Sequence, residues 1–210
     1  MKISKAEIVR EYGPFPDAEQ VHGVSFDGTN VWFAAGDRLT SFDPESGHTV
    51  RSIAVAGHAG TAFDGEHLFQ IAEDRILKID PKAGRVLASI PAPGGGGDSG
   101  LAWAEGSLWV GEYRERKIHQ IDCETGKVLR TIESNRFVTG VTWVDGELWH
   151  GTWEGDESDL RRIDPRTGEV IERIELPDDV AVSGLESDGR DLFFCGGGNS
   201  GKVRAVRRPS

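Results

Sequence analysis

The chain has 210 residues, of which 37% are hydrophobic, and its formal net charge is −11. This acidity excludes a nucleic-acid-binding protein that depends on a basic surface, and it excludes binding to an anionic membrane surface. No run of about 18 apolar residues is present, so the sequence predicts no membrane-spanning helix.

The first nine residues, Met-Lys-Ile-Ser-Lys-Ala-Glu-Ile-Val, lack the apolar segment of a signal peptide. The two cysteines, Cys123 and Cys195, fall at opposite ends of the repeat unit described below, so we expect no disulfide between them. Both features favour a cytoplasmic protein.

From residue 23 onward the chain repeats one unit five times. The first strand of each unit begins with a glycine, and these glycines are Gly23, Gly60, Gly100, Gly140 and Gly184. A period of about 40 residues made only of strands is typical of a β-propeller. We interpret residues that recur in all five copies as scaffold.

Each unit reads as four strands. The first ends in an Asp-Gly or Glu-Gly turn, whose residues tolerate positive φ. The second is rich in aromatic and β-branched residues, as in Leu108-Trp109-Val110. The third and fourth are joined by turns such as Asp164-Pro-Arg-Thr-Gly168, in which Asp bonds the backbone and Gly takes the left-handed conformation.

The fifth unit stops after its third strand. Residues 7–12 match the pattern of the fourth strand at 169–174, and they precede the first unit. Placing this strand in the last blade closes the ring, as a closed propeller requires. We therefore predict an all-β fold, a five-bladed β-propeller of four-stranded antiparallel blades. It forms a single domain over residues 1–210, and we expect a monomer.

The copies differ on one face, which we call the top, where the chain enters each inner strand and where the second and third strands are joined. Loops on a rigid scaffold tend to carry function. The residues before the leading glycines should ring the central mouth, and they are His22, Ala59, Ser99, Thr139 and Ser183. His22 is a candidate catalytic group. The three hydroxyl residues either bind substrate or hydrogen-bond to the backbone.

Two top-face loops on adjacent blades, residues 111–116 and 151–158, are rich in aromatic and charged residues. They suit a pocket wall, with Tyr113 and Trp153 as apolar faces. The polar groups of this pocket would be Glu112, Arg114 and Glu154. The alternative is a solvated pair of loops joined by a surface salt bridge.

Two strand residues also depart from the repeat. His150 replaces Phe33, Gln70, Val110 and Phe194, and it is either a catalytic base or a hydrogen-bonded core residue. Glu186 replaces Ser25, Ala62, Ala102 and Thr142, which predicts a polar axis where it could contact a ligand. The Gly94–Gly97 segment is either a lid or a plain connection.

The third copy, Gly106-Ser-Leu-Trp-Val-Gly-Glu-Tyr-Arg-Glu-Arg-Lys-Ile-His-Gln-Ile-Asp-Cys-Glu-Thr-Gly126, resembles the repeat of the streptogramin B lyase family. The five-fold count and the Asp-x-x-Thr-Gly-Lys-Val turn are similar to the glutamine cyclotransferase family, and the wider group includes YncE-like repeats. The cyclotransferase signatures Phe-Thr-Gln-Gly-Leu and Tyr-Glu-Ser-Thr-Gly are replaced here by Val21-His-Gly-Val24 and Phe33-Ala-Ala-Gly36.

These resemblances imply a lyase or cyclotransferase that acts on a small molecule or peptide at the top face. Glu112 matches the glutamate that follows the Trp-containing strand in the lyase repeat, with His150 and His22 as companions in acid–base catalysis. The lyase resemblance also suggests a divalent cation, magnesium or calcium, for which the sequence identifies no ligand set. A non-catalytic propeller that binds a protein or another ligand through the same face is the alternative, and the sequence leaves open whether the chain is an enzyme.

Overall fold

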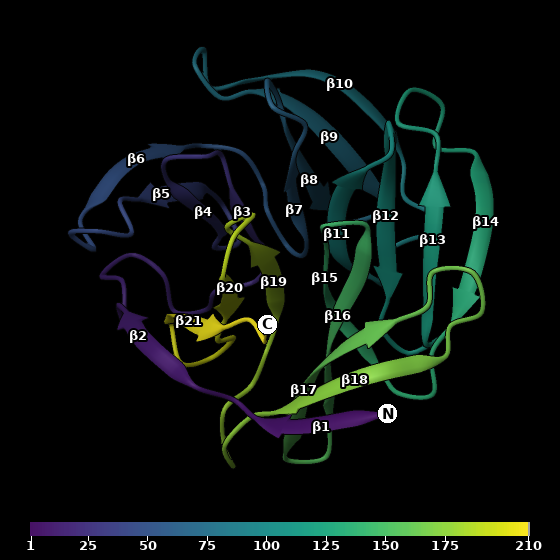
Figure 1. Cartoon of the computed structure of the whole chain (residues 1–210). Helices are drawn as coiled ribbons and strands as arrows, with labels where there is room; N and C mark the ends of the chain where they lie inside the picture. The colour runs from purple at the N-terminus through teal and green to yellow at the C-terminus, as the bar shows by residue number, and fades with distance from the viewer. Residues whose placement is uncertain (210) are drawn as a thin grey trace.

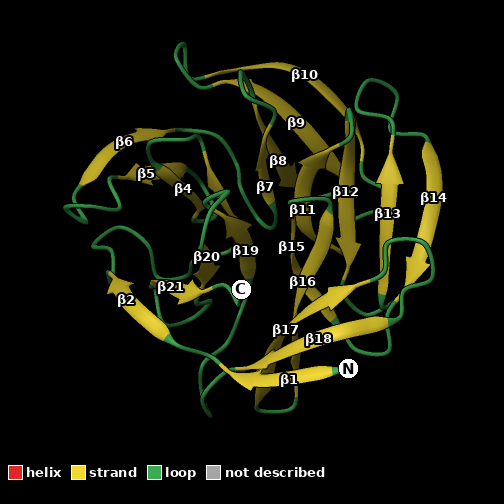
Figure 2. Cartoon of the chain, viewed as in Figure 1, coloured by secondary structure: helices red, strands yellow, loops and turns green. Residues whose placement is uncertain are grey.

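The computed structural model of the chain describes residues 1–209; Ser210, the last residue of the expected domain, lies outside the described residues. The described part contains 21 strands in five sheets and no helix. The sheets stand around a central axis (Figures 1 and 2). The prediction of an all-β, five-bladed propeller is confirmed.

The blades follow one another along the chain, and the first strand of each blade contacts the first strands of its neighbours. Blade one contains β3 (Val24–Phe26), β4 (Val31–Ala34), β5 (Leu39–Phe42) and β6 (Thr49–Ile53). Blade two contains β7 (Thr61–Phe63), β8 (Leu68–Ala72), β9 (Arg75–Asp80) and β10 (Arg85–Pro91). Blade three contains β11 (Asp98–Ala104), β12 (Ser107–Glu112), β13 (Lys117–Ile121) and β14 (Val128–Glu133). Blade four contains β15 (Val138–Val144), β16 (Glu147–Glu154), β17 (Glu157–Ile163) and β18 (Val170–Glu175). Blade five contains β19 (Gly184–Ser187), β20 (Leu192–Gly196) and β21 (Val203–Arg207).

The N-terminal strand β2 (Ile8–Tyr12) completes blade five. It pairs antiparallel with β21, with Tyr12 opposite Val203, and Figure 1 shows the two strands side by side. The Tyr12 ring is buried, and its hydroxyl donates a hydrogen bond to the carbonyl of Pro44 on blade one, at 2.9 Å. The predicted closure of the ring by residues 7–12 is therefore confirmed.

A second N-terminal strand, β1 (Lys2–Lys5), was not predicted. It pairs parallel with β18 and gives blade four a fifth strand. Lys2 Nζ lies 3.2 Å from Glu172, and Lys5 Nζ lies 3.7 Å from Glu175. The sequence did not reveal this strand because the segment is short and charged. Its pairing partner is a strand about 170 positions away.

The five leading glycines lie where neighbouring inner strands approach most closely. A Cβ at Gly23 would lie 2.6 Å from the Thr61 nitrogen, and one at Gly100 would lie 2.6 Å from the Val141 nitrogen. The same relation links each remaining leading glycine to the next blade, and Gly184 to Val24 of blade one. Only glycine permits this approach, so the recurrent glycine is set by the small diameter of a five-bladed ring.

The turns on the bottom face follow the predicted chemistry. In the turn from Asp43 to Gly47, Asp43 Oδ1 accepts the Glu45 N–H at 2.8 Å, and Gly47 has a φ of +77°. Asp80, Asp122 and Asp164 make the equivalent bonds in the next three blades. Their interpretation as scaffold agrees with the structure.

The hydrophobic core lies between the blades, in five clusters. Aromatic residues of the second strands fill it, including Trp109 and Trp149, whose side chains are fully buried. Cys123 and Cys195 are free thiols on blades three and five.

Candidate functional site

A chain of polar side chains runs across the top of blade three. Glu112, the last residue of β12, has its Oε2 3.0 Å from His119 Nε2 on β13, and His119 Nδ1 lies 2.8 Å from Thr131 Oγ1 on β14. A carboxylate only accepts hydrogen bonds, so Nε2 carries a hydrogen and donates it to Glu112, while Nδ1 shares a hydrogen bond with the Thr131 hydroxyl. The imidazole thereby fixes the orientation of the Glu112 carboxylate.

The hydrogen-bonded side chains of Glu112 and His119 are partly exposed to solvent. The Glu112 side chain is 16% exposed and that of His119 is 10% exposed. Sequence reasoning did not single out His119, although it replaces Thr40, Leu77, Arg161 and Arg204 at the equivalent register of the other third strands. Comparing the third strands with one another would have found it.

Asp98 lies beside Glu112 and organises the glycine segment above it. Its carboxylate accepts hydrogen bonds from the N–H groups of Gly94 at 2.8 Å and Gly96 at 3.4 Å. Burial raises the pKa of Asp98, and the nearby Glu112 acts in the same direction, although the two N–H groups oppose the change. Sequence reasoning did not identify Asp98 as part of a site.

The Gly94–Gly97 segment packs directly against Glu112. A Cβ at Gly94 would lie 3.0 Å from Glu112 Cγ and 2.9 Å from Asp98 Oδ1. The Gly97 carbonyl accepts a hydrogen bond from the Tyr113 N–H at 3.1 Å, which ties the segment to the end of β12. The absence of side chains is what lets this connection cover the carboxylates.

The two long top-face loops meet one another. The Tyr113 hydroxyl donates to the Trp153 carbonyl at 3.1 Å. Glu154 forms ion pairs with Arg116 and with Arg136, the latter at 3.2 Å. The structure thus brings together Tyr113, Trp153 and Glu154 in a loop-to-loop contact, whereas Arg114 is exposed.

The residues before the leading glycines mostly contact the backbone. Ser99 Oγ donates to the Val138 carbonyl at 2.7 Å, and Ser183 Oγ donates to the Val21 carbonyl at 2.5 Å. Thr139 is buried, and its hydroxyl has no partner among residues 1–209. His22 is half-buried, and burial, aided by the nearby His58, lowers its pKa.

His150 is enclosed in blade four. It has no exposed surface, and its Nδ1 lies 3.0 Å from the Gly151 carbonyl, while Nε2 has no partner in the described chain. Burial lowers the pKa of His150 to about 4, so the ring is neutral at pH 7. No hydrogen bond or ion pair between residues 1 and 209 joins any two of Glu112, Glu154, His22 and His150.

Glu186 bridges three blades at the axis. Its Oε1 accepts the Thr142 hydroxyl of blade four at 2.5 Å, and its Oε2 lies 3.3 Å from the Ser25 hydroxyl of blade one. Burial raises the pKa of Glu186 to about 7, although these hydroxyls and the Ser187 N–H oppose the change. The predicted departure from the repeat is real, and it joins blades four, five and one.

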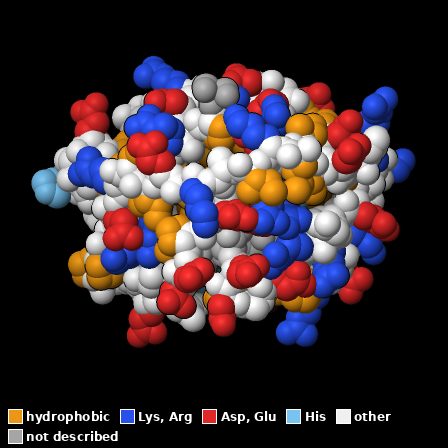
Figure 3. All heavy atoms as spheres, turned by 60° about the horizontal axis from the view of Figure 1, so that its bottom comes forward, with side chains coloured by type: hydrophobic (Ala, Val, Ile, Leu, Met, Phe, Trp, Pro, Cys, Tyr) orange, Lys and Arg blue, Asp and Glu red, His pale blue; other side chains and the backbone are white. Residues whose placement is uncertain are grey.

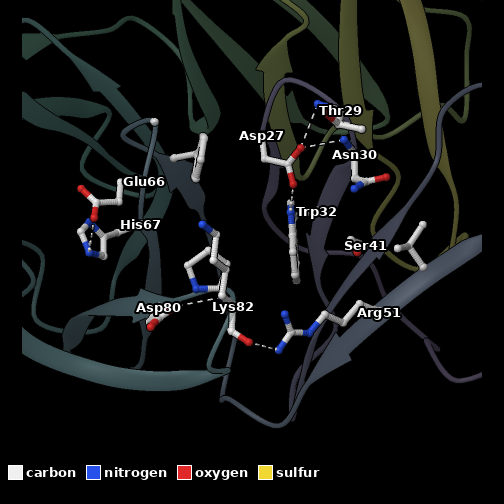
Figure 4. A pocket seen from close by; sticks show the side chains of 14 residues that line it. Asp27, Thr29, Asn30, Trp32, Ser41, Arg51, Glu66, His67, Asp80 and Lys82 are labelled. Atoms are coloured by element: carbon white, nitrogen blue, oxygen red, sulfur yellow. Dashed lines mark hydrogen bonds and ion pairs between the residues drawn. The ribbon is translucent and has the colours of Figure 1, made fainter.

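The largest of the five cavities described for residues 1–209 is at the opposite end of the blades, between blades one and two. It has a volume of 560 Å³ and includes Trp32, Ser41 and Arg51 of blade one and Lys82 of blade two in its lining (Figure 4). None of the five cavities described for residues 1–209 is lined by a residue that the sequence predicted to bind or act on a substrate.

Charges of both signs cover the surface. Figure 3 shows Lys and Arg side chains interspersed with Asp and Glu over the face that it presents, with no continuous basic area on that face. In the described chain, no helix is long and apolar enough to cross a membrane. The described residues also contain no cluster of three or more His, Cys, Asp or Glu side chains that could hold a metal ion, so they do not fit the divalent cation suggested by the lyase resemblance.

Comparison of the sequence with protein-family models gives no match, and comparison with curated proteins gives none either. Among solved structures, the glutaminyl cyclase of Myxococcus xanthus superimposes with a TM-score of 0.80 at 18% identity, over 98% of this chain and 97% of that protein. Hydrazine synthase of Kuenenia stuttgartiensis gives a TM-score of 0.54 at 18% identity, over 85% of this chain and 56% of that one. A chain of a mitotic checkpoint complex gives 0.54 at 15% identity, over 90% of this chain and 74% of that one. At these identities the similarities establish the fold alone, a β-propeller.

Proposed function

We propose that this propeller is an acid–base enzyme of the cyclotransferase type, with Glu112 as the group that carries the proton. The observation that supports it is the hydrogen-bonded chain from Glu112 through His119 to Thr131, partly exposed beneath a segment of four glycines. The full-length similarity of the fold to a glutaminyl cyclase supports an amino-terminal glutaminyl group as the proposed substrate class.

The proposed reaction needs one proton carrier. The substrate's α-amino nitrogen attacks the carbon of its own side-chain amide, a C–N bond forms, and the bond from that carbon to the amide nitrogen breaks. Glu112 Oε1, which makes no hydrogen bond within residues 1–209, takes a proton from the attacking nitrogen. It returns that proton to the departing nitrogen, which leaves as ammonia, so the carboxylate ends unchanged.

His119 and Asp98 are positioning residues in this scheme. The Nε2–H of His119 holds Oε2 of Glu112 and leaves Oε1 directed to the substrate. The Asp98 carboxylate accepts hydrogen bonds from the N–H groups of Gly94 and Gly96, and it thereby keeps the Gly94–Gly97 segment packed on Glu112.

The test is ammonia release from a glutaminyl dipeptide. We expect the wild-type chain to release ammonia and Glu112→Gln to lower the rate by about 10²- to 10⁴-fold, because the amide cannot accept the proton. The matched control is Glu133→Gln, on exposed β14 of the same blade, which should leave the rate unchanged. His119→Leu should also lower the rate, because the carboxylate loses the hydrogen bond that orients it.

A second reading is a non-catalytic ligand-binding propeller. One observation favours it: Glu112 lines none of the cavities described above. If the wild-type chain releases no ammonia from glutaminyl substrates, the cyclotransferase proposal is wrong and the binding function stands in its place. If Glu112→Gln retains full activity, the assignment of Glu112 as the proton carrier is wrong.

A further inference from the structure

The five spaces between neighbouring blades share one construction. Each has an aromatic ring from a second strand on its wall, and the strand register identifies these rings as Trp32, Phe69, Trp109, Trp149 and Phe194. The residue paired with each ring on the adjacent third strand is, in the same order, Ser41, Lys78, Gln120, Arg162 and Ala205. The five copies can therefore be compared position by position.

In two blades the chain places its own cation over this ring. Lys78 Nζ lies 5.9 Å from the centroid of the Phe69 ring, and the Arg130 guanidinium lies 4.9 Å from that of Trp109. Such placements are favourable because the negative face of the ring attracts a cation. In these two blades a basic side chain of the protein itself therefore occupies the space over the ring.

Blade one lacks the equivalent group. Ser41 is too short to reach over the ring and is buried, with its hydroxyl unpartnered within residues 1–209. Arg51, the next residue across the sheet, does not lie over Trp32, because its guanidinium donates to the Lys82 carbonyl of blade two at 2.7 Å. Among the described residues no cation lies over the Trp32 ring.

The cavity next to Trp32 also has the largest volume of the five described for residues 1–209. Ring pairs span the next three blade interfaces, with centroid distances of 5.8 Å for Phe69–Trp103, 4.9 Å for Trp109–Trp143 and 5.0 Å for Trp149–Phe193. In the described chain, Trp32 and Phe63 form no such pair, and the 560 Å³ cavity lies between these blades. Trp32 is 4% exposed, against 2%, 0%, 1% and 2% for its four equivalents.

We propose that this cavity binds a basic side chain, an arginine or lysine of a peptide or protein partner, in the position that Lys78 and Arg130 occupy in the next two blades. The ligand's cation would lie against Trp32, and the free hydroxyl of Ser41 would accept one of its N–H groups. Charge complements this assignment, because Asp27, Glu66 and Asp80 face the cavity and the cations Arg51 and Lys82 are fewer (Figure 4).

A hydrogen bond to Asp27 fixes the orientation of the Trp32 indole. Its Nε1–H donates to Asp27 Oδ2 at 2.7 Å, and the other oxygen of that carboxylate accepts the N–H groups of Thr29 and Asn30 (Figure 4). The ring is therefore fixed by the first turn of its own blade. The site is at the opposite end of the blades from Glu112, so it is independent of the proposed catalysis.

The experiment is calorimetric titration with tetra-arginine, tetra-lysine and tetraglutamate peptides at low salt. We expect one site for the two basic peptides, no binding of tetraglutamate, and a change in the NMR signal of the Trp32 indole N–H. Ser41→Lys should weaken binding at least about tenfold, because the chain's own ammonium then fills the place, as Lys78 does in blade two. Its melting temperature should stay near that of the wild type for the same reason.

Two further variants make the test specific. Asn199→Lys adds the same charge in an exposed loop of blade five and should leave binding unchanged, which separates filling of the cavity from a change in net charge. Lys78→Ser should open the equivalent space beside Phe69 and raise the stoichiometry from one site toward two. The proposal is overturned if the basic peptides do not bind, if Ser41→Lys binds like the wild type, or if neutral saccharides alone bind at Trp32.

Discussion

Replacing Gly140 by alanine is expected to lower the free energy of unfolding by about 4 kcal/mol or more, a value found only for severe packing defects. The new Cβ would overlap the backbone nitrogen of Leu185 and lie 2.5 Å from the Gly184 carbonyl carbon. Both atoms belong to the inner strand of the next blade, so relief requires a shift of one blade against another. The total stability of a domain is about 5–15 kcal/mol, so this loss is a large share of it.

The measurement is thermal and urea unfolding of the purified variant. For a chain of this size, a loss of about 4 kcal/mol lowers the melting temperature on the order of 10 °C. Gly97→Ala is the matched control, because its Cβ would lie 3.4 Å from the nearest atom, the Gly94 carbonyl oxygen, at an ordinary backbone conformation. We expect the control to change stability by less than about 1 kcal/mol. Equal melting temperatures for the two variants would show that the leading glycines do not set the blade spacing.

Glu186→Gln is expected to stabilise the protein by about 3 kcal/mol at pH 8 and to have little effect at pH 4, since one pKa unit corresponds to about 1.4 kcal/mol. Burial raises the pKa of Glu186 from 4.5 to about 7. Between these values the unfolded chain loses this proton while the folded chain keeps it, so stability falls as the pH rises from 4.5 to 7. The amide of glutamine is never ionised, and this loss disappears.

His150→Phe is expected to show the opposite pH dependence. Burial lowers the pKa of His150 from 6.5 to about 4, so the stability associated with the neutral ring is lost as the pH falls from 6.5 to 4. Phenylalanine stands at the equivalent position in blade one, as Phe33, and it does not titrate. The strand register places Cys195 at this position in blade five, so the alignment of His150 with Phe194 from the sequence is wrong. We expect the variant to gain about 3 kcal/mol relative to the wild type at pH 4, where the penalty is present, and no such gain at pH 8.

The two effects oppose one another in the wild-type protein. Between pH 4.5 and 6.5 the Glu186 contribution falls with pH while that of His150 rises, so the wild-type curve should be nearly flat there. Urea unfolding of the wild type and both variants at several pH values from 4 to 8 separates them. Parallel curves for all three proteins would mean that neither group titrates with an altered pKa in the folded state.

The candidate site shows where comparison within the chain reaches its limit. Glu112 was identified because it differs from the residues at the equivalent position of the other four repeats. The same comparison, extended to the third strands, would have identified His119. It could not have shown that Gly94–Gly97 packs on Glu112 or that Asp98 organises that segment, because those contacts depend on how the connection folds back over the blade. The loop residues Tyr113, Trp153 and Glu154 were predicted to line a pocket, and in the structure they contact one another and Arg116 and Arg136.

By itself the sequence determined the repeat, the number of blades, the turns and the closure of the ring by residues 7–12. These features rest on local chemistry: alternation along a strand, Asp and Gly in turns, and glycine at every close approach. Only the tertiary structure decided the pairing of β1 with β18, the bridge from Glu186 to Ser25, and the open cavity beside Ser41. Those features join residues up to 170 positions apart, and no local pattern encodes which blade faces which.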